Sequence, residues 1–141
     1  AGLLTACRPA PPFTDSQNQP VALADFAGKP LLVNYFAPWC APCLREIPLL
    51  EALAREGQTA VVMVNYDPAT PAELAKLAGQ YHIKVPLLIA RQEASLPFPH
   101  PAGLPTSYLL DGEGKLQQTL VGELNPSRLE ALRASVKSLD H

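Results

Sequence analysis

The chain has 141 residues, of which 48% are hydrophobic and 17% are charged, and its formal net charge is −2. This length favours a single domain, and the composition is that of a folded protein rather than a disordered one. The sequence has no long basic run that would favour nucleic-acid binding, and no apolar run near the roughly 18 residues of a membrane-spanning helix.

The start of the chain suggests export from the cytoplasm. The sequence LTAC, which ends at Cys7, resembles the lipobox of bacterial lipoproteins, in which the signal peptide is removed and the cysteine is lipidated. The residues before Cys7 would be the tail of such a signal peptide, and the following RPAPP suits an extended tether. The resemblance implies a lipid anchor on a bacterial membrane, inner or outer. The alternative is an exposed cysteine in a ragged terminus.

Hydrophobic periodicity predicts the elements that follow. In chain order we expect a hairpin at 13–22, a helical turn at 23–28, a buried strand at 31–37, a helix at 41–56 with an internal proline kink, a strand at 59–66, a helix at 71–81, an apolar segment at 85–90, a hairpin with strands at 106–111 and 115–122, and a helix at 126–139. We therefore predict a tether at 1–10 and one α/β domain at 11–141, a mixed sheet flanked by helices on both faces.

Two closely spaced cysteines lie where the 31–37 strand gives way to a helix. Cys40 and Cys43 are separated by Ala-Pro, and Trp39 precedes them. Free N–H groups and the dipole at a helix N-terminus stabilise a thiolate, and Pro42 suits the first helical turn because it has no N–H to offer. We therefore expect Cys40 to be an exposed nucleophile of lowered pKa, Cys43 to be the resolving thiol, and Trp39 to form an apolar lip.

A zinc site is the main alternative for this cysteine pair, because two cysteines at this spacing begin many zinc knuckles. Such a site needs two further ligands. The remaining candidates, Cys7, His82, His100 and His141, are isolated in the sequence, and there is no second cysteine pair. The sequence therefore favours redox chemistry, without a metal or a cofactor.

Longer motifs resemble those of the thioredoxin superfamily, and most closely its extracytoplasmic ResA/TlpA/DsbE-like thiol–disulfide oxidoreductases. The motifs are GKPLLVNYFAPWCAPCLREIPLLEAL, VVMVNYD, GLPTSYLLDGEGKL and VGELNPSRLEAL, which together span most of residues 11–139. The resemblance implies a thioredoxin-like fold with an N-terminal hairpin extension and an active dithiol at Cys40 and Cys43.

The resemblance also implies a substrate groove beside the dithiol. Pro105 matches the cis-proline that faces the dithiol in this superfamily, and the backbone of Leu104 would pair with a bound substrate chain. The alternative is a trans-proline in an ordinary loop. The Pro-rich stretch 97–103, with His100, departs from the family, which usually has a helical segment there. It would form either a distinct rim of the groove or a rigid surface loop.

Glu46 lies one helical turn after Cys43, in the motif CxxExP. In the branch that this chain resembles, an acid at this position tunes the dithiol pKa or handles protons. Asn34 stands where cytoplasmic thioredoxins carry a buried aspartate, which makes Glu46 the substitute proton carrier. The alternative is an exposed carboxylate that stabilises the start of any helix.

The sequence thus predicts a periplasmic thiol–disulfide oxidoreductase that reduces protein disulfides through a mixed disulfide. Candidate substrates are apocytochrome c, a methionine sulfoxide reductase and a copper-site assembly protein, and the electron donor would be a membrane thiol reductase of the DsbD/CcdA type. Two alternatives remain: an oxidant or isomerase on the same fold, and a copper chaperone of the Sco type. The latter uses CxxxC and a partnering histidine, whereas this chain has CxxC.

Overall fold

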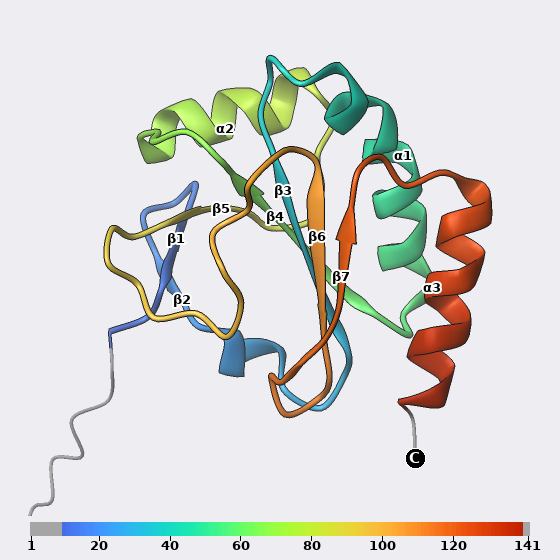
Figure 1. Ribbon diagram of the computed structural model, residues 1–141. Helices are drawn as coiled ribbons and strands as arrows, with labels where there is room; N and C mark the ends of the chain where they lie inside the picture. Colours follow the sequence, from blue (N-terminus) through green and yellow to red (C-terminus); the bar gives the residue numbers. More distant parts are fainter. Residues whose placement is uncertain (1–9, 140–141) are drawn as a thin grey trace, which may run out of the picture.

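The computed structural model describes residues 10–139. In chain order its elements are β1 (Phe13–Asp15), β2 (Pro20–Val21), the 3-10 helix η1 (Leu23–Phe26), β3 (Leu31–Phe36), α1 (Ala41–Glu56), β4 (Ala60–Asn65), α2 (Pro71–Gln80), β5 (Leu87–Ala90), β6 (Thr106–Leu110), β7 (Leu116–Val121) and α3 (Pro126–Ser138) (Figure 1). The predicted elements are confirmed, with ends that shift by a residue or two. Within residues 10–139, none of the helices combines the length and the apolar character needed to cross a bilayer.

The strands form one sheet of seven in the order β2-β1-β5-β4-β3-β6-β7. The β3–β4 and β4–β5 pairs are parallel, and the other neighbours are antiparallel. The two central strands β3 and β4 are buried almost throughout, as the near-continuous apolar runs predict for strands covered on both faces. The mixed sheet and the N-terminal hairpin, which extends it through β5, are therefore confirmed.

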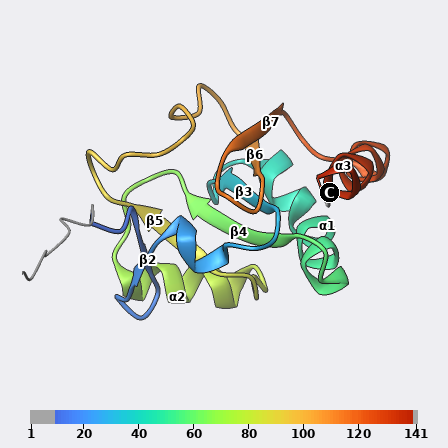
Figure 2. The same ribbon diagram turned by 90° about the horizontal axis from the view of Figure 1, so that it is seen from below.

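The three α-helices all pack on one face of the sheet, which corrects the expectation of helices on both faces (Figure 2). The strand order β5-β4-β3 means that the β3–α1–β4 and β4–α2–β5 connections step along the sheet in the same direction. Two right-handed crossovers that step the same way place their helices on the same face. Helix α3 joins them there, with Leu129 and Leu132 in the same core.

The opposite face is covered by η1 and by the segment 91–105. Phe98 of this segment stacks on Tyr108 with ring centroids 4.3 Å apart and meets Tyr35 edge-on at 6.1 Å. The Tyr108 hydroxyl donates a hydrogen bond to the carbonyl oxygen of Pro99 at 2.7 Å. An irregular Pro-rich segment, fixed by aromatic contacts, thus covers this face of the sheet.

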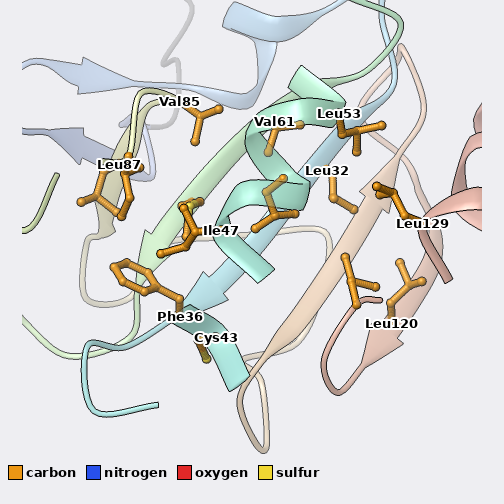
Figure 3. Packing of buried hydrophobic residues seen from close by; sticks show 14 of the residues in the cluster. Leu32, Phe36, Cys43, Ile47, Leu53, Val61, Val85, Leu87, Leu120 and Leu129 are labelled. Carbon is orange, nitrogen blue, oxygen red and sulfur yellow. The ribbon is translucent and has the colours of Figure 1, made fainter. Parts of the chain in front are cut away.

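The core between the sheet and the helices surrounds α1, which continues without a break through Pro48. Figure 3 labels Leu32, Phe36, Ile47, Leu53, Val61 and Leu129 of this core. The core also includes the buried side chains of Leu50, Met63 and Leu132. Each of the larger aliphatic side chains contributes about 2 kcal/mol by leaving water. Cys43 lies at one edge of this core, in the first turn of α1. The core therefore fixes the end of the helix that carries the dithiol.

Candidate active site

The dithiol lies at the N-terminus of α1, one short turn after β3. Cys40 is the residue that caps the helix, and its sulfur accepts a hydrogen bond from the backbone N–H of Cys43 at 3.3 Å. The two cysteines form a disulfide, with their Cα atoms 5.3 Å apart. Ala41 and Pro42 occupy the first helical turn, where a missing N–H costs nothing. The local sequence thus places the Cys40 sulfur next to the free backbone N–H groups at the start of α1.

The two sulfurs differ in burial. The Cys40 residue is 6% exposed and Cys43 is not exposed at all. Cys40 is therefore the more exposed of the two cysteines, which agrees with its expected role as the nucleophile. The sequence also predicts that Cys40 is openly exposed, and for the disulfide form this prediction is wrong. The reason is that the disulfide holds Cys40 against the helix-side core, to which both cysteines belong.

Trp39 is the exposed side chain of this region, at 65% exposure. Its indole Nε1–H donates to Oδ2 of Asp67 at 2.6 Å, and its ring meets Tyr66 edge-on with centroids 6.5 Å apart. Asn65 fixes this turn by donating from Nδ2 to the carbonyl oxygen of Asp67 at 2.8 Å. Sequence reasoning missed Tyr66 and Asp67. They follow β4, and the C-terminal ends of the parallel strands β3 and β4 meet at one edge of the sheet, so their position was a usable signal.

The Leu104–Pro105 peptide bond is cis, as predicted. The strand register pairs Thr106 with Tyr35, so Pro105 lies at the end of β3 from which the chain continues to Cys40. The carbonyl oxygen of Pro105 accepts a hydrogen bond from Gly122 at 2.9 Å, which fixes it to the residue after β7. Leu104 is half-buried and contacts the cores on both faces of the sheet.

Glu46 is fully buried, so it is not an exposed helix-start carboxylate. Its Oε1 accepts a hydrogen bond from Nδ2 of Asn34 at 2.6 Å, and its Oε2 accepts one from the backbone N–H of Leu124 at 2.8 Å. Asn34 also donates to Oγ of Ser107 at 2.9 Å. Burial raises the pKa of Glu46 to about 7, against the opposing effect of the hydrogen bonds from Leu124 and Asn34. A carboxyl of this pKa exchanges a proton near neutral pH.

The remaining candidate metal ligands do not form a cluster with the two cysteines within residues 10–139. His82 is exposed at the end of α2, and His100 packs against Tyr66 with ring centroids 5.0 Å apart. Among residues 10–139, no group of three or more His, Cys, Asp or Glu side chains lies close enough together to hold a metal ion. Cys7 and His141 fall outside the described residues, so the lipidation site is still only a prediction.

Comparisons with known proteins agree with this geometry. A family model described as Redoxin matches residues 6–134. The chain is 34% identical over 113 residues to the thioredoxin-like protein YneN of Bacillus subtilis (strain 168), covering 77% of this chain and 66% of that protein. It is 31% identical over 126 residues to the thiol–disulfide oxidoreductase ResA of Bacillus thuringiensis subsp. konkukian (strain 97-27), covering 86% of this chain and 72% of ResA.

A solved structure is also similar. The crystal structure of a putative thiol:disulfide interchange protein DsbE from Chlorobium tepidum aligns with a TM-score of 0.74 at 25% sequence identity, covering 94% of each chain. The seven-stranded mixed sheet with the CxxC pair after a central strand is therefore the thioredoxin-like fold.

Proposed function

The chain belongs to the Redoxin family, and we propose that within this family it is an extracytoplasmic reductant of protein disulfides. It is a thiol–disulfide oxidoreductase, because named oxidoreductases of this kind match most of the chain and the CxxC pair lies at the active-site position. The observation that carries the proposal is the hydrogen bond from the Cys43 N–H to the Cys40 sulfur at the start of α1. The same N–H favours a thiolate on Cys40 once the disulfide is reduced.

The proposed reaction begins with the reduced dithiol. The Cys40 thiolate attacks one sulfur of the substrate disulfide, so that a Cys40–substrate disulfide forms, the substrate S–S bond breaks, and the first substrate sulfur leaves as a thiolate. Cys43 then loses its proton and attacks the Cys40 sulfur, which releases the second substrate thiolate. The protein ends as the Cys40–Cys43 disulfide. The substrate gains two electrons, and its two thiolates take up two protons from water, which balance the protons that Cys40 and Cys43 gave up, so that both substrate sulfurs become thiols.

Glu46 is proposed to accept the proton that Cys43 loses. Both residues lie on α1, one helical turn apart, and the carboxyl pKa of about 7 lets Glu46 take and return a proton near neutral pH. Thiolate absorbance against pH tests this role. Glu46→Gln should lower the apparent pKa of Cys40, because a nearby carboxylate disfavours a second negative charge. Superimposable curves for the two proteins would contradict it.

The location, anchor and partners are proposed from the sequence. The lipobox-like sequence before Cys7 supports a lipid anchor on the outside of the cytoplasmic membrane or on an outer membrane. An extracytoplasmic reductant needs electrons from across the membrane, which a thiol reductase of the DsbD/CcdA type would supply. The substrate class is a protein disulfide, with apocytochrome c, a methionine sulfoxide reductase and a copper-site assembly protein as the candidates.

The reduction potential decides between a reductant and an oxidant. Trp39 is the single tryptophan of the chain and adjoins Cys40, so its fluorescence reports the redox state in a glutathione or dithiothreitol buffer. We expect a potential below about −200 mV, in the range of reducing thioredoxin-like proteins. A value near −120 mV, typical of a strong oxidant, would overturn the reductant assignment and favour an oxidase or isomerase.

A further inference from the structure

A cavity lies on the loop side of the sheet, beside the dithiol but outside the reaction described above. Its volume is about 680 Å³, and its lining includes Tyr35, Tyr66, Asp67, Glu93, Phe98 and His100. They come from β3, from the turn after β4 and from the 91–105 segment. The cavity is therefore built largely by the Pro-rich segment that stands where relatives were expected to have a helix.

A row of aromatic rings connects the cavity to the active site. Trp39, which precedes Cys40, meets the ring of Tyr66 at 6.5 Å, and Tyr66 meets the ring of His100 at 5.0 Å. Extended chain advances about 3.3 Å per residue. The two steps from ring to ring are together comparable with about three residues of extended chain, so we expect a side chain that many residues from a cysteine held at Cys40 to reach the cavity.

The lining carries two carboxylates, Asp67 and Glu93, among side chains that are otherwise mostly neutral. Asp67 uses Oδ2 to accept from Trp39, which leaves Oδ1 for another donor, and Glu93 is an exposed carboxylate at the rim. The lining also includes one cation, Arg91. Its guanidinium donates to the carbonyl oxygens of Pro11 at 2.6 Å and Ala10 at 3.2 Å, so its hydrogen-bonding capacity is turned to the N-terminal segment.

The Tyr35 hydroxyl adds an uncommitted polar atom. The residue is only 3% exposed and lines the cavity, yet its hydroxyl forms no hydrogen bond among residues 10–139. The hydroxyl oxygen is not one of the buried side-chain atoms that lack a partner, so it is open to the cavity and to a ligand that donates a hydrogen bond. The rings of Tyr66 and His100, which pack on one another with centroids 5.0 Å apart, also line the cavity and offer aromatic surface to a flat or compact cation.

We propose that this cavity binds a cationic side chain, lysine or arginine, of the substrate polypeptide, close in sequence to the disulfide cysteine that Cys40 attacks. This inference rests on the proposed function, since it concerns which disulfides the reduced protein prefers. Carboxylates at the rim attract the cation, the rings of Tyr66 and His100 pack against it, and Tyr35 and Asp67 accept its hydrogen bonds.

The test uses three synthetic peptides that differ at one position. Each has a cysteine in a disulfide with 2-mercaptoethanol, and three residues away it carries arginine, glutamine or glutamate. The reduced full chain is mixed with each peptide, and Trp39 fluorescence follows oxidation of the dithiol. We expect a second-order rate constant about fivefold larger for the arginine peptide than for the glutamine peptide, and a smaller one for the glutamate peptide.

Two variants locate the preference in the cavity. Glu93→Gln should reduce the arginine-to-glutamine ratio to about twofold, and Tyr35→Phe should reduce it while leaving stability unchanged, because no intramolecular hydrogen bond is lost. Glu113→Gln is the matched control: it removes the same charge from an exposed site in the β6–β7 turn and should leave the ratio unchanged.

Three results would count against the proposals, and they are distinguishable. Equal rates for the three peptides would overturn the cation site and leave the reductase function standing. An equal loss of preference in Glu93→Gln and Glu113→Gln would assign it to overall charge and would also overturn the cavity. Failure of the reduced protein to react with any of the three peptides would contradict the proposed function itself.

Discussion

The two faces of the sheet are covered in different ways. On the helix face, α1, α2 and α3 bury a mainly aliphatic core, and Asn34 donates a hydrogen bond to the buried Glu46 of α1, the helix that carries the dithiol. On the other face, an irregular Pro-rich segment holds its place through the rings of Phe98 and His100. The comparison predicts a division of work, in which the helix face would set the redox chemistry and the loop face would select the substrates that reach it.

The largest expected effect is on disulfide reduction, which should depend on the cysteines of α1 and not on the segment that covers the loop face. Cys40→Ser should abolish disulfide reduction, because the attacking sulfur is lost, whereas Cys43→Ser should trap the substrate on Cys40 as a mixed disulfide. Phe98→Ala, a change on the loop face, should leave the reduction potential unchanged. Non-reducing gel electrophoresis with mass spectrometry and a redox titration measure these outcomes. A potential that shifts in Phe98→Ala would show that the faces are not separate.

The next prediction compares the two faces by stability. Leu50 is fully buried on the helix face, and Phe98 is 6% exposed on the loop face. Leu50→Ala and Phe98→Ala should each lower the free energy of unfolding by about 3 kcal/mol, because each leaves a cavity in a packed cluster. Urea denaturation of both variants provides the measurement. A loss below about 1 kcal/mol for Phe98→Ala would mean that the segment 91–105 is a loose cover rather than part of the core.

The pH dependence of stability tests the helix face alone. The pKa of Glu46 is about 7 in the folded protein and 4.5 without burial. Between these values the folded chain binds the extra proton, so the free energy of unfolding should fall by about 3 kcal/mol as the pH rises from 4.5 through 7. In Glu46→Gln this fall should be absent. Denaturant midpoints across this pH range measure it, and parallel profiles for the two proteins would contradict the raised pKa.

The structure offers a reason why the glutamine variant should fold. The Oδ1 atom of Asn34 has no hydrogen-bond partner among the described residues. If the Asn34 amide turns over, this oxygen can accept from the new amide group at position 46 and from the Ser107 hydroxyl. The Asn34 amide nitrogen then takes the unpartnered place that Oδ1 holds now, so the substitution removes the charge and still leaves one polar atom of Asn34 without a partner.

The smallest expected effect lies at the boundary between the faces. Asp67→Ala removes the acceptor of the Trp39 indole and should reduce the rate of substrate reduction about twofold to threefold without changing the reduction potential. The indole, released from Asp67, should also show lower fluorescence anisotropy. Asp67→Asn, which keeps an acceptor oxygen, serves as the control. Wild-type anisotropy in Asp67→Ala would mean that the contact with Tyr66 alone holds Trp39.

The features that the sequence predicted correctly depend on residues that are close together along the chain. Periodicity located every element, and the position of Cys40 before a helix indicated its cap. Contacts between distant residues account for the rest. The burial of Glu46 depends on Asn34 and Leu124, which are far from it along the chain. The covering of the loop face depends on Phe98 finding Tyr108. Hydrophobic periodicity does not reveal either of these long-range contacts. The placement of the three helices on one face could be predicted only once the order of the strands in the sheet was known.

The contact between Arg91 and the N-terminal segment has a mechanical consequence. A load applied to the chain before residue 10 reaches the fold at the two hydrogen bonds from the Arg91 guanidinium to the carbonyl oxygens of Ala10 and Pro11. The backbone bond from Arg91 to Pro12 and the β1–β5 ladder carry it next, into an inner strand. Because α1 and the dithiol lie across β4 from this path, tension on the N-terminus would be borne by β5 and would leave the reactive sulfurs undisturbed.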